Sequence, residues 1–386
     1  MRMRKISILI LSLSFLAFKS FAQGIDNDNF IVTHGPWIQN PGTSGVTIIW
    51  TTNKPAIPGI LLTMPDGNSK FIRNSHDGII DGGGTLHKVR IDGLLPATEY
   101  KYSISSVQVL KYQAYKIYYG DTLTSGQLSF RTFPETDANV NFTVFNDVHE
   151  QAGKLGSYLR HNNAASQDFY FFNGDMMDWL QSPDEMFAAF IDTASKYFAG
   201  KKPFFYVRGN HEARGYANRE LKDWFDFRDD RYYYGFNYGP CYFIVLDCGE
   251  DKPDDNRYYY ALADYDSYRL KELEWLKQEI KKPAFMQAKY RIVIVHMPVL
   301  KAENQNHAMT MLSDKYGPVL KEGDIDLMIS AHIHRNAFYD KDKTGYGYPL
   351  LVNSNNSFVE LTAGMQGIKA VVKDPDGKVL AQYDFK

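Results

Sequence analysis

Cysteine is almost absent from this chain of 386 residues, which contains only Cys241 and Cys248. Both lie in one apolar run, 241–248, which predicts a single buried strand. Seven residues of extended chain cover ~23 Å, whereas a disulfide needs Cα atoms ~4.4–6.8 Å apart. This excludes a disulfide between the two cysteines, and we expect two free, buried thiols.

An excess of charge of one sign is also missing. Lys and Arg number 43 and Asp and Glu number 45, so the formal net charge is −2. No general basic field would attract nucleic acid or a membrane surface, and we expect neither as a stable partner. The sequence shows no internal repeat and no low-complexity run.

Long apolar runs are missing after the first residues, so no later segment could span a bilayer, which needs about 20 residues. The chain starts with a charged segment, an apolar core over 6–18 and a small-residue cleavage site ending at Ala22. This pattern predicts a signal peptide over 1–22. No cysteine follows the cleavage point, so we expect no lipid or membrane anchor. The mature protein is predicted to be soluble and exported, either periplasmic or secreted; its oligomeric state remains open.

Residues 28–134 read as an all-β sandwich. Residues 46–51 are β-branched around Trp50, which is predicted to be a core residue. The stretch Leu94-Leu95-Pro96-Ala97-Thr98-Glu99-Tyr100 resembles the corner of fibronectin type III domains, where a tyrosine hydroxyl bonds back to nearby backbone. The histidines of this region lack metal-ligand spacing.

After a short polar linker, residues 138–386 alternate strands with helices, which is typical of an α/β layered fold. Helices are predicted over 151–161, 184–198 and 266–282. The third is expected to bury a stripe of Leu270, Leu273, Leu276 and Ile280, to turn its Glu and Lys side chains outward, and to end at Pro283.

The stretch around which the second domain is organised is 169–178. Four aromatic residues predict a buried parallel strand that ends abruptly in Asn173-Gly174-Asp175. In α/β sheets, chemistry gathers just beyond the carboxyl ends of such strands. The same event recurs four more times, where apolar strands run into Asn146-Asp147-Val148-His149, Arg208-Gly209-Asn210-His211-Glu212, His296-Met297-Pro298 and Ala331-His332-Ile333-His334. Each strand ends in side chains that can bind a metal ion.

Taken in order, these strand ends read Asp-x-His, Gly-Asp-x-x-Asp, Gly-Asn-His-Glu, a lone His and Ala-His-x-His. This order resembles the calcineurin-like metallophosphoesterase superfamily over roughly 139–353. Together with the preceding β-sandwich, the layout is similar to the purple acid phosphatase branch. The resemblance implies an α/β sandwich metallophosphoesterase domain behind a fibronectin III-like sandwich.

The resemblance implies two divalent metal ions, Zn, Fe or Mn, held ~3.5–4 Å apart. The first ion would be bound by Asp147, His149 and His334, the second by Asn210, His296 and His332, and Asp175 would bridge them. The implied enzyme is a metal-dependent, acid phosphatase-like hydrolase. It would cleave small phosphomonoesters by direct attack of metal-bound hydroxide, without a covalent intermediate.

His211 is not an implied ligand. In the family the corresponding histidine faces the substrate and assists the leaving oxygen, and Asp178 is expected to orient His211 as a catalytic dyad. Purple enzymes carry tyrosine at the position of Asp178, so we predict a colourless protein. Ala331 replaces the usual glycine, which should be tolerated if its backbone avoids positive φ.

Several assignments remain open. Arg208 and Arg214 are compatible with phosphate binding, but solvent exposure or a structural ion pair is at least as well supported. Glu212 is expected to support the metal ligands. His307 lies in a predicted loop near the site. The same constellation would also serve a phosphodiesterase or nucleotidase, or a binding module with a non-catalytic metal centre.

Overall fold

The computed structural model describes residues 29–135 and 139–385. The predicted signal peptide, 1–22, lies outside the described residues, as does most of the predicted linker. Among the described residues, no helix combines the length and hydropathy needed to cross a membrane.

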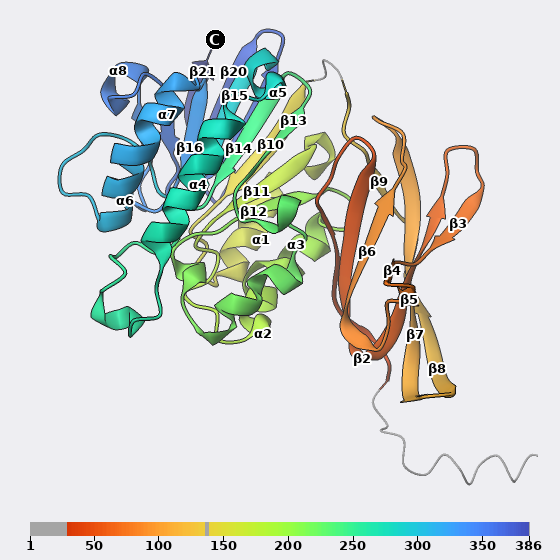
Figure 1. Ribbon diagram of the computed structural model, residues 1–386. Coiled ribbons are helices and arrows are strands. Elements are labelled where there is room, and N and C mark those ends of the chain that lie inside the picture. The colour runs from red at the N-terminus through yellow and green to blue at the C-terminus, as the bar shows by residue number, and fades with distance from the viewer. Residues whose placement is uncertain (1–28, 136–138, 386) are drawn as a thin grey trace, which may run out of the picture.

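The N-terminal part is built of antiparallel strands, as predicted (Figure 1). The long strand β2 organises it, because its first half pairs with β1 and β6 and its second half with β3 and β7. The strands are β1 Val32–Gln39, β2 Gly45–Thr63, β3 Ser69–Ile72, β4 Ser75–His76, β5 Ile79–Ile80, β6 Gly84–Asp92, β7 Glu99–Gln113, β8 Lys116–Thr124 and β9 Leu128–Arg131.

Trp50 lies at the centre of this region, fully buried, and its indole N–H donates to Oγ of Ser106 at 2.9 Å. The hydroxyl of Tyr100 accepts a hydrogen bond from the backbone N–H of Leu95 at 2.8 Å. That bond is the backbone contact expected of the corner motif. A specifically fibronectin III-like topology stays a prediction.

The remainder of the chain forms two six-stranded mixed sheets. The first has the order β12-β11-β10-β19-β20-β21 and the second β13-β14-β15-β16-β18-β17. Their strands are β10 Val140–Phe145, β11 Phe169–Asn173, β12 Phe204–Val207, β13 Tyr234–Tyr238, β14 Cys241–Leu246, β15 Tyr290–Val295, β16 Leu327–Ser330, β17 Ala337–Tyr339, β18 Leu350–Val352, β19 Phe358–Gly364, β20 Gly367–Lys373 and β21 Val379–Phe385.

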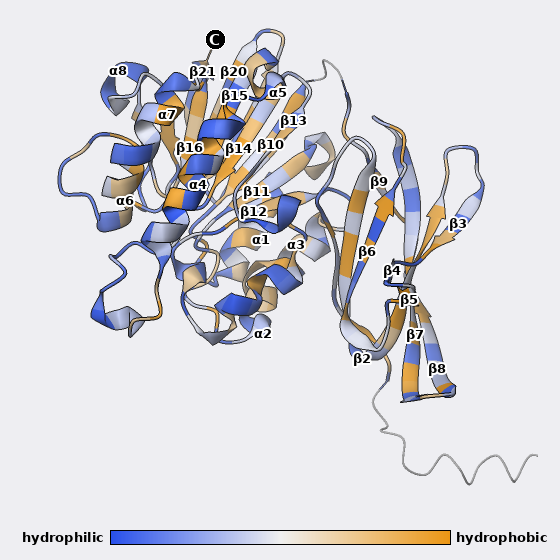
Figure 2. Cartoon of the chain, viewed as in Figure 1, coloured by the Kyte–Doolittle hydropathy of each residue, from blue (hydrophilic) through white to orange (hydrophobic). Residues whose placement is uncertain are grey.

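The two sheets pack face to face through aromatic side chains. Phe169 of β11 meets Phe243 of β14 with ring centroids 5.5 Å apart, and Phe171 and Phe205 belong to the same core. Figure 2 shows hydrophobic residues concentrated along these central strands. The predicted α/β layering is confirmed.

Helices cover the outer faces of both sheets (Figure 1). The α-helices are α1 Ala152–His161, α2 Pro183–Met186, α3 Asp192–Tyr197, α4 Tyr265–Glu279, α5 Pro283–Gln287, α6 His307–Met311, α7 Gly317–Glu322 and α8 Lys341–Thr344, with single π-turns at Phe187–Ile191 and Leu312–Tyr316. Short 3₁₀ helices span Ala164–Ser166, His211–Ala213, Tyr216–Trp224, Arg228–Asp230 and Arg257–Tyr259.

Helix α4 differs from its prediction in which residues it buries. Leu273 and Leu276 are buried, but Leu270 is 47% exposed, and Glu272 and Glu279 face inward. Glu272 turns inward because its carboxylate accepts the backbone N–H of Asp247 at 2.8 Å. Pro283 does not simply end the predicted helix: α4 stops at Glu279 and the proline opens α5.

Both cysteines are free and buried, as predicted.

The N-terminal strands contact the first α/β sheet near β12. The side-chain amide of Gln39 donates to the carbonyl of Phe204 at 2.8 Å, and the hydroxyl of Tyr102 donates to the carbonyl of Gly200 at 2.6 Å.

Candidate metal centre

Five loops meet at one edge of the α/β region because their strands run parallel within each sheet. Strands β10, β11 and β12 are parallel neighbours, as are β15 and β16. Carboxyl ends of parallel strands share an edge, so the loops that follow them converge. These are the loops in which the sequence placed its candidate ligands.

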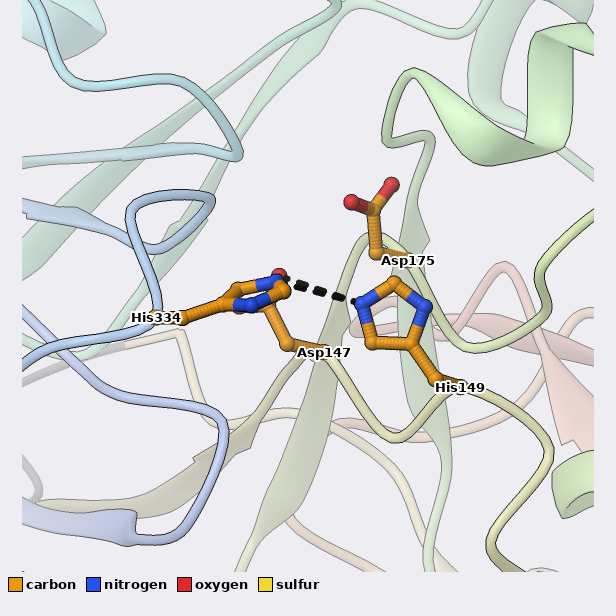
Figure 3. A group of neighbouring side chains, drawn as sticks. All are labelled: Asp147, His149, Asp175 and His334. Carbon is orange, nitrogen blue, oxygen red and sulfur yellow. Dashed lines mark hydrogen bonds and ion pairs between the residues drawn. The ribbon is translucent and has the colours of Figure 1, made fainter.

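The first cluster consists of Asp147, His149, Asp175 and His334, whose ligand atoms all lie within 4.8 Å of one another (Figure 3). Nε2 of His334 lies 3.1 Å from Oδ1 of Asp147 and 3.2 Å from Nε2 of His149. The structure therefore brings the predicted first set and the predicted bridge together.

The second cluster consists of Asp175, His296 and His332, within the same limit of 4.8 Å. Nε2 of His296 lies 3.0 Å from Oδ2 of Asp175. Asp175 thus belongs to both clusters. Both chain neighbours of Asn210 lie close to Asp175. An added Cβ on Gly209 would overlap Oδ1 of Asp175, and the backbone N–H of His211 donates to the same oxygen at 3.0 Å.

The buried Oδ1 of Asn210 has no hydrogen-bond partner among the described residues. The buried Oδ1 of Asp147 and Nε2 of His296 face only other candidate ligands, His334 at 3.1 Å and Asp175 at 3.0 Å. Leaving such groups unsatisfied costs about 1–3 kcal/mol each, so native proteins seldom do it without another partner. Carboxylate, amide and imidazole donors are the set that Zn, Fe or Mn accepts. The residues present fit divalent metal ions.

The backbone is unusual at five of the seven candidate ligands. Asp147, His149, Asp175, His332 and His334 have φ of 47°, 49°, 53°, 70° and 53°. Side chains other than glycine adopt this left-handed region at a cost of roughly 1–3 kcal/mol each, and such residues concentrate at functional sites. Ala331 is not among the residues with positive φ, so the condition for replacing glycine there is met.

Hydrogen bonds on Nδ1 fix the direction of the histidines. His296 donates from Nδ1 to the carbonyl of Asn173 at 2.8 Å, and Nδ1 of His149 lies 2.7 Å from Oδ1 of Asp178. In both rings Nε2 is left to face the clusters. Partners of this kind orient metal-binding imidazoles and raise their basicity.

The carboxylate of Asp178 lies near both His149 and His211, but its hydrogen bond goes to His149 rather than to the predicted partner His211. Nδ1 of His211 instead donates to the backbone carbonyl of Asp178 at 2.8 Å, and the nearest carboxylate oxygen is 4.0 Å away. Nε2 of His211 faces Nη1 of Arg214 at 3.1 Å and Oδ2 of Asp175 at 3.9 Å.

Glu212 organises the loops behind the ligands. Its fully buried carboxylate accepts backbone N–H groups from Gly209, Asp175 and Met176 at 2.8, 3.0 and 2.7 Å. Burial raises the pKa of the Glu212 carboxyl, and the nearby charge of Asp175 raises it further.

The two arginines are now distinguished. Arg208 is buried in an ion pair with Asp247, Nη2 to Oδ2 at 2.5 Å, which favours the structural alternative. Arg214 is held by Glu250 through two contacts, Nη2 to Oε1 at 2.8 Å and Nε to Oε2 at 3.1 Å. Nη1 of Arg214 remains directed at His211.

Sequence reasoning missed Asp247 and Glu250. They follow β14, which is another apolar strand ending in acidic residues, and that repetition was the available signal.

His307 lies outside both metal clusters, with Nε2 2.9 Å from each carboxylate oxygen of Asp266.

The charges around Asp175 favour its ionised carboxylate, which is the form that binds a metal ion. Burial raises the pKa of its carboxyl, but the charges of His296 and His211 outweigh burial and lower the pKa below its ordinary value. Burial, reinforced by His296, lowers the pKa of His332 to about 4. Burial lowers the pKa of His296, but Asp175 outweighs it and raises the value to about 10. A bound cation would replace that proton.

A family model for calcineurin-like phosphoesterases matches residues 140–336. Among solved structures, a purple acid phosphatase from yellow lupin (Lupinus luteus) seeds superposes with a TM-score of 0.66 at 14% identity, covering 90% of this chain and 73% of that one. The structure of PhoD superposes with a TM-score of 0.60 at 12% identity, covering 91% of this chain and 88% of that one. At these identities the likeness concerns the fold.

Proposed function

The chain belongs to the calcineurin-like phosphoesterase family, and we propose that it hydrolyses phosphomonoesters at a centre of two divalent metal ions. The observation that carries this proposal is the position of Asp175, which is shared by two clusters of ligand atoms. A carboxylate between two sites is what a bridged pair of ions requires.

Within this proposal, Asp147, His149 and His334 hold one ion, and Asn210, His296 and His332 hold the other. When bound, the ions supply a water activated for attack and positive charge opposite the phosphate. Asp147 and Asp175 offset about half of the charge of two divalent ions, and the neutral Asn210 adds none, so the site keeps a net attraction for anions.

His211 would assist the leaving oxygen. Its Nδ1–H is held by the carbonyl of Asp178, and Nε2 faces the site beside Arg214. Nε2 accepts an N–H of Arg214 in this structure. His211 can therefore donate from a protonated Nε2 as the ester bond breaks only once Arg214 releases it, or it can stabilise, together with Arg214, the charge that develops there. Arg214, oriented by Glu250, adds a second cation at the same side.

Hydrolysis of 4-nitrophenyl phosphate and bis(4-nitrophenyl) phosphate, with Mn or Zn added and metal content measured, tests the proposal. Faster turnover of the monoester supports a phosphomonoesterase, whereas faster turnover of the diester indicates a phosphodiesterase. Full metal content without turnover of either ester would leave a binding module. We further propose that the centre is colourless, because Asp178 stands where tyrosine would give a visible absorption band.

We also propose that residues 28–134 form a fibronectin III-like domain ahead of a catalytic domain at 138–386. The corner hydrogen bond of Tyr100 and a hydrophobic cluster around Trp50 support it. Limited proteolysis should cut first within 134–138.

Export is the last part of the proposal, supported by the sequence pattern of residues 1–22. The protein recovered outside the cytoplasm should begin at Gln23 by intact mass. An uncleaved N-terminus would contradict it.

A further inference from the structure

A cavity of about 820 Å³ lies beside His211. Two of its lining residues, Ala213 and Arg214, continue the chain directly from His211, and Arg214 also contacts that imidazole. His211 is the residue proposed to face the leaving oxygen. The group attached to that oxygen would therefore project past His211 into this cavity.

The cavity wall is rich in tyrosine. Much of it comes from the loop between β14 and α4, which projects from the body of the α/β region (Figure 1). Tyr258 and Tyr260 are 62% and 84% exposed, and Leu262 beside them is 75% exposed. Apolar surface left open beside a cavity marks a place where a ligand packs.

Other rings of the wall are fixed in position. The hydroxyl of Tyr259 accepts the backbone N–H of Lys252 at 3.2 Å, and the ring of Tyr265 lies edge-on to it with centroids 6.4 Å apart. Tyr268 donates from its hydroxyl to Asp247 at 2.6 Å. A cavity wall that contains both anchored and exposed rings offers aromatic surface to a flat guest.

Most charges around the cavity are paired; among the described lining residues, Arg219 and the carboxylate of Asp264 have no ion-pair partner. Arg214 and Lys252 pair with Glu250 and Asp251. Arg219 forms no ion pair or hydrogen bond with another described residue. Its guanidinium can stack on a ring or donate to ring carbonyl and nitrogen acceptors.

We propose that this cavity receives the alcohol part of the substrate and selects phosphate esters whose alcohol carries a planar aromatic ring, such as a nucleobase or a phenyl group. The inference rests on the proposed phosphomonoesterase function and specifies its substrate class. An aliphatic group of equal size would bury similar area, but it would lack the stacking that aromatic pairs add.

The test compares benzyl phosphate with cyclohexylmethyl phosphate on the full-length, metal-loaded protein. The two alcohols are similar in acidity and size, so the comparison isolates the planar ring. We expect kcat/KM to favour the benzyl ester by about 10-fold, within the range measured for one stacked ring. Adenosine 5′-phosphate against ribose 5-phosphate then shows whether a nucleobase is preferred as well.

Replacing the two open rings together, Tyr258→Leu with Tyr260→Leu, should reduce the benzyl preference to about 1 while keeping apolar side chains in place. Tyr115→Leu, at a fully exposed turn between β7 and β8, is the matched control and should keep the preference. Equal kcat/KM for both esters in the wild type, or a preference that survives the double substitution, overturns the inference and leaves the phosphomonoesterase proposal standing.

If neither ester is hydrolysed by protein that holds two ions, the proposed function fails. The affinities of benzylphosphonate and cyclohexylmethylphosphonate, measured by calorimetry, then test the ligand preference of the cavity independently of catalysis. Tighter benzyl binding that the double substitution abolishes supports the aromatic site, and equal affinities exclude it.

Discussion

Oδ1 of Asp178 lies 2.7 Å from Nδ1 of His149 but 4.0 Å from Nδ1 of His211. The carboxylate therefore serves the candidate metal ligand, and His211 is served by the backbone carbonyl of the same residue. One residue thus orients two imidazoles through two different oxygen atoms. A substitution of its side chain should affect only one of them.

Asp178→Asn should weaken metal binding at the first cluster by about 10–100-fold, the usual effect of losing such a partner of a metal-binding histidine. The carbonyl that holds His211 is unchanged by the substitution. Competition with a chelator, followed by metal analysis, measures the affinity. Asp121→Asn, on exposed β8, is the control. Unchanged affinity together with a large loss of kcat would instead support a dyad with His211.

Asn210 and His211 are neighbours with different proposed roles, so their alanine variants should separate. Asn210→Ala removes a partnerless buried oxygen that is proposed to bind the second ion, and we expect loss of one metal equivalent and collapse of turnover. His211→Ala should keep both ions and lose about 10²–10⁴-fold in kcat. Metal analysis of both variants is the measurement. If His211→Ala loses metal, the roles are assigned wrongly.

Gly174 allows His296 to approach Asp175. Its φ is +80°, and an added Cβ would overlap Nδ1 of His296. Gly174→Ala should therefore displace His296 and lose the second ion. Gly67→Ala is the matched control, because its φ is +87° and nothing lies within 4 Å of the added Cβ. Both variants carry a backbone penalty of about 1–2 kcal/mol in thermal unfolding, but only Gly174→Ala should change metal content. Equal metal content in the two would show that the close approach is dispensable.

The meeting of the strand ends could be predicted because a buried parallel strand and the polar residues after it leave a local signature. The particular atoms that contact one another could not be predicted. The backbone carbonyl of Asp178 reaches His211 through the turn that follows Asp175, and turn geometry is not encoded in a ligand spacing. The end of β14 could have indicated Glu250 as a site residue, but an acidic stretch without periodicity does not predict its bond to Arg214.

Helix α4 shows a second limit. A face with spacing of three and four residues can run through Arg269, Leu273, Leu276 and Ile280 or through Leu270. Apolar character alone favoured including the leucine. The structure buries Arg269, whose guanidinium donates to the carbonyl of Cys248 at 2.9 Å, and exposes Leu270. A buried polar network that forms only in the folded chain decided between the two.

His87 gives the N-terminal sheet an acid sensitivity. Burial lowers its pKa from 6.5 to about 4, while its ring packs against Trp50 and Nε2 lies 2.8 Å from Oγ1 of Thr52. In the unfolded chain the imidazole binds a proton below about pH 6.5, but in the folded chain only below about pH 4. The free energy of unfolding should therefore fall as pH drops from 6.5 towards 4, by at most about 3 kcal/mol, and level off below.

His87→Gln should keep a hydrogen-bonding partner for Thr52 and remove the titration. The difference between Tm at pH 7 and Tm at pH 5, followed by calorimetry, should shrink relative to the wild type. His161→Gln, at the exposed end of α1, should leave that difference nearly unchanged. An identical difference in the wild type and in His87→Gln would mean that other groups govern the acid response, because a neutral buried imidazole must cost stability wherever the unfolded chain alone is protonated.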